Sequence, residues 1–560
     1  MGRATLLKTE EEAWESKTML RRLIGRLKGA PVDRKALLGT FCVLIGLSIF
    51  REWDIWTTGF LATDEMEYSK LAISHSVYPG RFVFSEINNV MFRLFGVNGV
   101  DKFAIFLPAY GLLWSGLTVL LFYAIMKKLG FNARTVALSL FSALFILVYV
   151  LLAISFLTEP VGLLFAMLGI YMLLRFAKGK SELGVGQMLI SALGSSVGFT
   201  LAAGVREPYG AYLVGGTLAF VVAARDWKPK FRGGSKTRWL LVGLAVLLFV
   251  GPPLLYLSSS GHAASVVLGS LSKSFKQLGS DPGSIISTTL ETFVLSMLLG
   301  YGPILAVVTL VGLAIVTIGA IRLRDSSRLV IILLSLTAFC STLVAGFTFS
   351  SVPNFVSFGN FSTILRLAHT SLPAYFLVGP FAQALIVRKK KLLYGYVTLL
   401  VIFVLVATPT LELYAASNVT LNPSTPTFTG GNPFSLSYRS PGVQVRDYIQ
   451  DNPGGGPFIV VGSPLSKTPG GDTLLATTTY GYVNNTSFLT YRWTTFYLYV
   501  GTESVNATVS RYPYLAQFIY PRSQEGSSQY PYKVGSDQVV LSGLAFELIR
   551  IELQWTPSVV

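Results

Sequence analysis

Charged residues are scarce in this chain of 560 residues: they make up 13% of it, against about 25% in ordinary soluble domains. Hydrophobic residues make up 52%, and apolar runs close to twenty residues long recur between positions 36 and 410. Each run is long enough to cross a hydrocarbon core about 30 Å thick as a helix. Since a backbone in lipid must satisfy its own hydrogen bonds, we predict a polytopic α-helical membrane protein and exclude a string of soluble domains.

Cysteine and histidine are also rare. The two cysteines, Cys42 and Cys340, fall in apolar runs, so we expect no disulfide and small buried side chains at both positions. With only three histidines, the chain offers no ligand spacing of the structural-zinc kind. A Gly-rich phosphate loop of the Walker type and an inverted repeat of interrupted helices are also lacking. The basic residues 1–35 precede no cleavage site, so we expect the first apolar run to stay as an anchor.

The apolar runs and the charges together predict a topology. We place about eleven transmembrane helices at residues 36–53, 103–126, 135–156, 161–176, 186–204, 209–224, 239–257, 302–321, 329–349, 370–387 and 392–410. Segments on one side of these spans carry most of the 45 lysines and arginines. Because cytoplasmic loops are enriched in these residues, the net charge of +17 indicates a cytoplasmic N-terminus and not nucleic-acid binding. An odd number of spans then places residues 411–560 outside the cell membrane.

The chain divides into three predicted parts: a basic N-terminus 1–35, a transmembrane domain 36–410, and an extracytoplasmic domain 411–560. Glycine and proline punctuation with short β-branched and aromatic runs, at Phe458–Val461 and Phe496–Val500, predicts that the last part is small and α/β or β-rich. It contains Asn-x-Ser/Thr triplets, typical of N-glycosylation, at Asn418, Asn484, Asn485 and Asn506.

Two outer loops belong to the transmembrane domain, at residues 54–102 and 258–301. The first is rich in polar and aromatic residues. The second ends in an apolar stretch, 286–300, which fits either a span or a helix in the membrane interface.

Ionisable groups near membrane depth are costly, so those that remain are candidate functional sites. They cluster at the predicted outer ends of the spans, at Asp64, Glu65 and Tyr68, at Glu159, at Arg206 with Glu207, and at Arg366 with His369. Carboxylates can act as a general base or as ligands of a hard cation, and arginines can hold a phosphate bidentately.

Each of these candidates has a plainer interpretation. Asp64 fits a solvated loop residue, Arg206 fits a local ion pair with Glu207 at a helix end, and His369 fits an interfacial packing residue. As a group, however, acids and arginines at neighbouring outer ends favour a reaction on a phosphorylated lipid whose head group reaches the outer leaflet.

The segment Thr63–Ala72, with Asp64, Glu65 and Tyr68, resembles the first outer loop of GT-C membrane glycosyltransferases, in the protein-O-mannosyltransferase and aminoarabinose-transferase branch. Further similar segments follow in the same order, at Tyr78–Arg81, Leu94–Gly99, Ser155–Glu159, and Arg366 with Pro373. The sequence departs from the family at Leu367, where a tyrosine is usual, and it lacks the WWDYG motif of oligosaccharyltransferases. That lack argues against transfer of a whole oligosaccharide.

The resemblance implies a GT-C-like fold and transfer of a sugar from a polyprenyl-phosphate donor to a protein, lipid or glycan. In this interpretation Asp64 is the leading catalytic residue, Glu65 is its neighbour in the motif, and Glu159 is a second acid. The resemblance also implies that Arg206, Arg366 and Arg81 contact the donor phosphate, with His369 and Tyr68 as accessory residues. A divalent cation, Mg²⁺ or Mn²⁺, would bind at Asp64 and Glu159 if one is used.

Other classes of function fit parts of the pattern. In a transporter or a lipid-linked-sugar flippase, the same charges would line a translocation path, although such proteins place ionisable residues near the bilayer centre. A GT-C-like protein without catalysis would serve as an assembly partner. The rarity of cysteine, the basic predicted cytoplasmic face and the clustered glycosylation triplets lean towards an archaeal-type plasma membrane.

Overall fold

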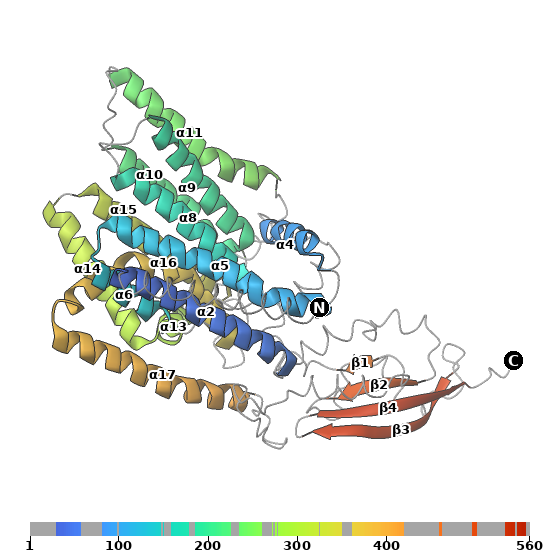
Figure 1. Ribbon diagram of the computed structural model, residues 1–560. Coiled ribbons are helices and arrows are strands. Elements are labelled where there is room, and N and C mark those ends of the chain that lie inside the picture. Colours follow the sequence, from blue (N-terminus) through green and yellow to red (C-terminus); the bar gives the residue numbers. More distant parts are fainter. Residues whose placement is uncertain are drawn as a thin grey trace, which may run out of the picture.

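The computed structural model is a bundle of helices followed by a separate group of strands (Figure 1). It describes residues 30–57, 81–97, 100–146, 158–178, 185–225, 235–259, 281–323, 325–349 and 361–418, the four strands, and isolated residues between them. Asp64, Glu65, Tyr68, Asn484, Asn485 and Asn506 lie outside the described residues. Arg366 and Asn418 lie in described helices, but their side chains are outside the described part.

The helices follow the predicted spans closely. In chain order they are α2 (Val32–Thr57), α4 (Phe82–Phe95), α5 (Val100–Leu129), α6 (Ala133–Ala143), α8 (Thr158–Lys178), α9 (Val185–Val205), the 3-10 helix η1 (Glu207–Gly210), α10 (Ala211–Arg225), α11 (Ser235–Ser259), α13 (Pro282–Gly300), α14 (Pro303–Leu323), α15 (Ser326–Phe349), α16 (Phe361–Ile386) and α17 (Lys390–Asn418). Among the described residues, five helices are long and apolar enough to cross a membrane: α5, α8, α9, α14 and α15. The chain is therefore a multi-pass membrane protein, as its composition predicts.

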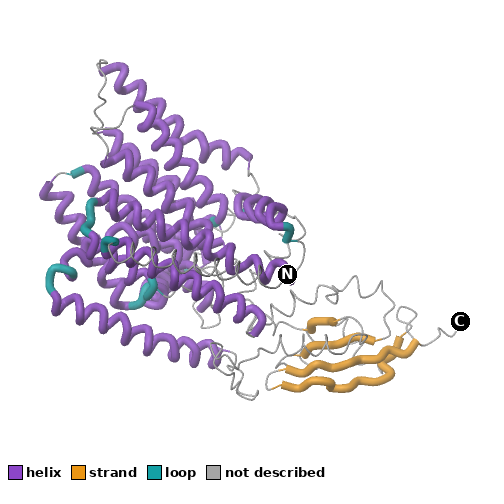
Figure 2. The backbone as a smooth tube through the Cα atoms, viewed as in Figure 1, coloured by secondary structure: helices purple, strands orange, loops and turns teal. Residues whose placement is uncertain are grey.

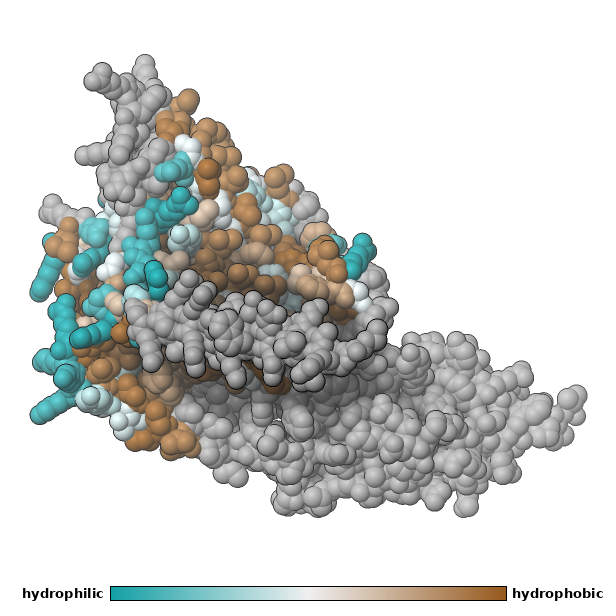
Figure 3. All heavy atoms as spheres, viewed as in Figure 1, coloured by the Kyte–Doolittle hydropathy of each residue, from teal (hydrophilic) through white to brown (hydrophobic). Residues whose placement is uncertain are grey.

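The surface has the pattern expected of such a bundle. Figure 3 shows hydrophobic side chains over the flank of the bundle and hydrophilic ones gathered towards one end. Large apolar side chains along one face of α13 are exposed, at Ile286, Leu290, Val294 and Leu298. Their spacing of four residues makes a continuous stripe on a helix, suited to contact with lipid.

Small residues let α8 and α9 pack against each other with their backbones close. A methyl group added at Gly198 would overlap the backbone of Gly169, and one added at Gly169 would overlap the ring of Phe199. Close approach through glycine is a common way to associate helices in membranes, where apolar side chains gain little by leaving lipid. This packing brings the first turn of α8 beside the last turn of α9, where the candidate charges lie.

Several expectations need correction. The predicted span 135–156 is not one regular helix, because α6 ends at Ala143 and hydrogen bonds from Leu144, Phe145 and Ile146 to residues three earlier tighten the chain there. The two cysteines, Cys42 and Cys340, are exposed and not buried, although both are free as expected. In a bundle surrounded by lipid, an apolar run does not show which of its faces is buried.

The structure also adds two helices inside the predicted outer loops. Helix α4 lies in loop 54–102 and ends at Gly96, whose positive φ of 62° is the left-handed conformation typical of a helix C-terminus. Helix α13 contains the stretch 286–300, and Phe293 packs edge-on against Phe339 of α15. It is joined to α14 through Tyr301 and Gly302, and Tyr301 meets Tyr375 of α16. Helix α13 therefore packs within the bundle.

The strands form one mixed sheet in the order β1-β2-β4-β3 (Figure 2). Strand β1 (Phe458–Val461) pairs in parallel with β2 (Thr495–Val500), while β4 (Phe546–Trp555) pairs antiparallel with both β2 and β3 (Tyr532–Gly543). The two runs that the sequence predicts as strands are strands. That the residues 411–560 make an extracytoplasmic domain remains a prediction.

Candidate functional site

Glu159 lies in the first turn of α8 and is fully buried. The hydroxyl of Thr158 donates a hydrogen bond to its Oε2 atom over 3.1 Å. The unsatisfied N–H groups at a helix N-terminus favour negative charge nearby, so this position stabilises the carboxylate. An ionised acid at this depth also requires a positive partner, since a buried lone charge is very costly.

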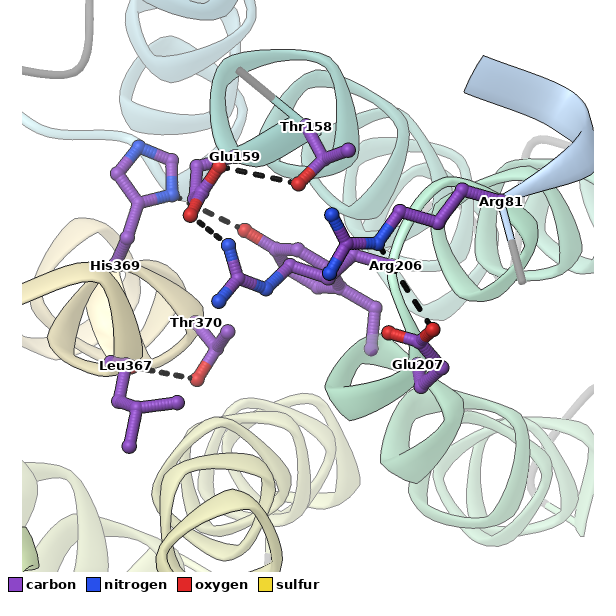
Figure 4. Close-up of polar contacts among 9 residues, drawn as sticks. Arg81, Thr158, Glu159, Arg206, Glu207, Leu367, His369 and Thr370 are labelled. Atoms are coloured by element: carbon purple, nitrogen blue, oxygen red, sulfur yellow. Dashed lines mark hydrogen bonds and ion pairs between the residues drawn. The ribbon is translucent and has the colours of Figure 1, made fainter. Parts of the chain in front are cut away.

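That partner is Arg206, directly after the last residue of α9. Its guanidinium forms an ion pair with Oε1 of Glu159, and the arginine is 4% exposed (Figure 4). The backbone at Arg206 is extended, with φ −156° and ψ 129°, and Pro208 lies in the first turn of η1. Because proline has no N–H group and its ring collides with the preceding helical turn, Pro208 cannot extend α9. The chain leaves the helix at Arg206, whose side chain meets α8.

Arg81 pairs with the next acid along the chain. Its Nε atom lies 3.9 Å from Oε1 of Glu207, and the two side chains are 16% and 29% exposed. Arg81 directly precedes α4 as its N-cap residue, so it connects the first outer loop to the end of α9. The expected local pair of Arg206 with Glu207 is not formed. Instead Arg206 pairs with Glu159 and Arg81 pairs with Glu207, and we call these two contacts the crossed ion pairs.

His369 reaches the same region from α16. Its Nδ1 atom lies 3.2 Å from the hydroxyl of Tyr209, and both residues are buried. Figure 4 shows His369 and Thr370 on the same helix, α16. The hydroxyl of Thr370 bonds to the carbonyl of Leu367 over 2.8 Å. His369 is therefore a buried, hydrogen-bonded residue, and its role as an accessory residue of the site stays a prediction.

Tyr209 is a residue that the sequence analysis missed. It stands two positions after Glu207, and a methyl group at Gly162 of α8 would overlap its ring. The ring therefore fills the space that the glycine leaves, and its hydroxyl points to α16. The signal in the sequence is only its proximity to the Arg206-Glu207-Pro208 motif.

Metal binding has limited support from these residues. Among the described residues there is no group of three or more histidine, cysteine or acidic side chains placed to hold an ion. The two oxygens of Glu159 already bond to Arg206 and Thr158, and such a neutralised carboxylate is a weak ligand for a hard cation. Asp64, the other predicted ligand, lies outside the described residues, so a cation site at Asp64 and Glu159 stays a prediction.

In chemical terms the region combines two buried or half-buried arginines, two acids, and a hydrogen-bonded histidine at the meeting point of α8, η1, α16 and the start of α4. These are groups that can hold an anionic head group at a helix end. Asp64 and Glu65 belong to the chain segment directly before Arg81, and Arg366 lies one turn before His369 in α16.

Two solved structures of ArnT from Cupriavidus metallidurans match the chain over most of its length. The structure bound to undecaprenyl phosphate matches with a TM-score of 0.46 and 14% identity, over 92% of this chain and 97% of that one. The apo structure matches with a TM-score of 0.44 and 14% identity, over 91% and 97%. No protein-family model and no curated protein matched the sequence.

Proposed function

We propose that this protein is a GT-C-type glycosyltransferase that transfers a sugar from a polyprenyl-phosphate donor to an acceptor on the outer face of a cell membrane. The observation that carries the proposal is the pair of crossed ion pairs at the ends of α8 and α9, joined through Arg81 to the loop that bears Asp64. The first-loop motif with Asp64 and Glu65 supports the same class of enzyme.

The chemistry needs a base and a stabilised leaving group. Asp64 takes the proton of the acceptor group as its oxygen or nitrogen attacks the anomeric carbon of the sugar. The bond from that carbon to the phosphate oxygen breaks, and its electron pair leaves with the polyprenyl phosphate. The head group thereby gains one negative charge, which positive side chains stabilise more strongly than they stabilise the bound donor.

The arginines provide this stabilisation in different ways. Arg81 is half-buried and lies at the start of α4, so a head group entering from the membrane surface meets it first. Arg206 lies deeper, where Glu159 fixes its guanidinium and the low dielectric strengthens each interaction. A planar guanidinium can donate two parallel hydrogen bonds to a phosphate, so Arg206 can serve the phosphate while still paired with Glu159. Arg366 is the third arginine that we propose to contact the donor phosphate.

The proposal is tested by sugar transfer with the purified full-length protein. The donors are one sugar on polyprenyl phosphate and the same sugar on a soluble nucleotide, each assayed with and without EDTA. We expect transfer from the lipid donor alone. Transfer from the nucleotide sugar only would contradict the proposal. Movement of the lipid donor across vesicles without cleavage would instead support a flippase.

A further inference from the structure

Glu207 stands in an unusual position relative to the proposed phosphate site. It is one half of the weaker of the two crossed pairs: 3.9 Å separates it from Arg81, and both side chains are partly exposed. A partly exposed ion pair is held by about 0–1 kcal/mol, whereas a buried pair such as Glu159 with Arg206 resists separation, because either partner alone would be a buried charge. The two acids at this end of the bundle therefore differ in how readily they leave their arginines.

The balance of positive and negative side chains around Arg81 determines how well this region can bind an anion. Arg81 and Arg206 are each opposed by a carboxylate, so these four side chains carry no net charge. An anionic phosphate binds where positive charge is in excess or where donors are free to turn to it. The Glu207 carboxylate therefore lies beside the Arg81 guanidinium, where an oxygen of the phosphate would have to bind.

We propose that Glu207 is an internal competitor of the donor phosphate: the lipid head group displaces its carboxylate from Arg81, while Glu159 keeps Arg206 in place. The inference rests on the proposed function in that the lipid phosphate is brought to Arg81. The backbone supports exchange by side-chain rotation alone, since Glu207 begins the short helix η1 and Pro208 restricts the backbone around it. With 29% of its side chain exposed, Glu207 has room to turn towards solvent.

The competition is measured by binding and not by transfer. The full-length protein in detergent is titrated with a polyprenyl phosphate that carries no sugar, and with the neutral polyprenol of equal length as control. Removing the competing charge in Glu207→Gln should tighten phosphate binding about two- to fivefold. This is the change in the dissociation constant that corresponds to losing a weak, partly exposed ion pair. Arg81→Gln should weaken it at least about tenfold, since a charge-assisted hydrogen bond is lost. Neither change should alter binding of the polyprenol.

A double variant identifies the cause. If Glu207 acts through Arg81, adding Glu207→Gln to Arg81→Gln should produce no further tightening. Unchanged or weaker phosphate binding in Glu207→Gln would overturn the inference, and so would equal tightening in the Arg81→Gln background. If Glu207→Gln does not fold, Glu207→Asp serves instead, because its shorter side chain weakens the same pair and should shift binding in the same direction.

The outcomes separate this inference from the proposed function. Tighter phosphate binding in Glu207→Gln, in a protein that transfers no sugar from any polyprenyl-phosphate donor, would overturn the transferase and keep the competition. Sugar transfer together with unchanged binding in Glu207→Gln would overturn the competition alone.

Discussion

Two clusters of buried polar side chains lie within the helical bundle, and they differ in charge. The first surrounds Gln383, about four turns of α16 beyond His369. Gln383 accepts a hydrogen bond from Ser139 over 2.6 Å and donates to the hydroxyls of Tyr375 and Tyr396 over 3.1 Å each. The hydroxyl of Tyr396 in turn donates to Ser142 over 2.9 Å. The second cluster, at Glu159, is held by ion pairs.

The difference separates a structural role from a functional one. The Gln383 cluster consists of neutral groups from α6, α16 and α17 that satisfy one another, and such a network fixes the positions of helices at low electrostatic cost. The Glu159 cluster keeps full charges in the bundle, which neutral residues would avoid. Charges that a fold does not need for packing are the ones to test for a role in binding and catalysis.

Breaking the buried ion pair should have the largest effect on stability. Glu159→Ala leaves the Arg206 guanidinium buried without its carboxylate, which should lower the free energy of unfolding by about 3–5 kcal/mol. Thermal unfolding in detergent measures this loss. The double variant Glu159→Leu with Arg206→Met should regain most of the stability while sugar transfer stays lost. If the double variant is active, the pair serves the fold alone.

Disrupting the neutral cluster should cost less and spare the site. Gln383→Leu removes the acceptor of the Ser139 hydroxyl and the donor to the hydroxyls of Tyr375 and Tyr396, so we expect a loss of about 1–3 kcal/mol in the free energy of unfolding. KM for the lipid donor should not change. The exposed neighbour Leu385, replaced by alanine, is the matched control and should be nearly neutral. If KM for the lipid donor rises in Gln383→Leu and not in Leu385→Ala, the Gln383 cluster also serves the site, and its role is not purely structural.

The hydrogen bond of Tyr209 provides a smaller test at the charged cluster. Tyr209→Phe keeps the ring against Gly162 and removes the hydroxyl that meets His369, so stability should fall by about 0.5–1.5 kcal/mol. Tyr212→Phe is the control, because its hydroxyl makes only a long hydrogen bond of 3.4 Å to the carbonyl of Thr370. Equal losses of stability in Tyr209→Phe and Tyr212→Phe would show that the contact between Tyr209 and His369 does not stabilise the fold.

The smallest effect is expected at Asp33, in the first turn of α2, where an ion pair lies outside both clusters. Burial raises the pKa of Asp33, but a hydrogen bond and the charge of Lys127, with a further hydrogen bond from Tyr123, lower it more, so the pKa lies below its ordinary value. A lowered pKa stabilises the fold above the ordinary value, and that stability is lost as pH falls through the folded value. The half-exposed Lys127 limits the effect to about 1 kcal/mol or less.

Thermal unfolding of the wild-type protein and of Asp33→Asn measures this contribution. The wild type should unfold at the higher temperature near about pH 7, and the difference should shrink towards about pH 3. A difference that grows on acidification would mean that the pair with Lys127 does not stabilise the fold.

The helices were predictable because hydrophobic length is a local property. The predicted spans 161–176 and 186–204 lie inside α8 (Thr158–Lys178) and α9 (Val185–Val205), and the strand run Phe458–Val461 is β1. The partner of Arg206 was not predictable in this way. Its pairing with Glu159 follows from the close approach of two helices at glycines, and the sequence alone suggested the adjacent Glu207.

Other features of the site depend on contacts between distant segments. Tyr209 and His369 meet across 160 positions of sequence, and neither lies in a pattern that indicates the other. Helix α4 escaped prediction because its 14 residues are too short for a span, although Phe84, Asn88 and Phe92 repeat at helical spacing and are buried. The candidate acids and arginines, by contrast, were found because charged residues are rare at the ends of apolar runs.

The most direct test of the proposed transferase is the initial rate of sugar transfer from a polyprenyl-phosphate donor by the wild-type protein and by Asp64→Asn. The amide is nearly the same size as the carboxylate but cannot take the acceptor proton. We predict a rate at least about a hundredfold lower, with an unchanged unfolding temperature and unchanged binding of polyprenyl phosphate. Full transfer by Asp64→Asn would contradict the assignment of Asp64 as the base, and absence of transfer by the wild type with every lipid donor would contradict the proposed function.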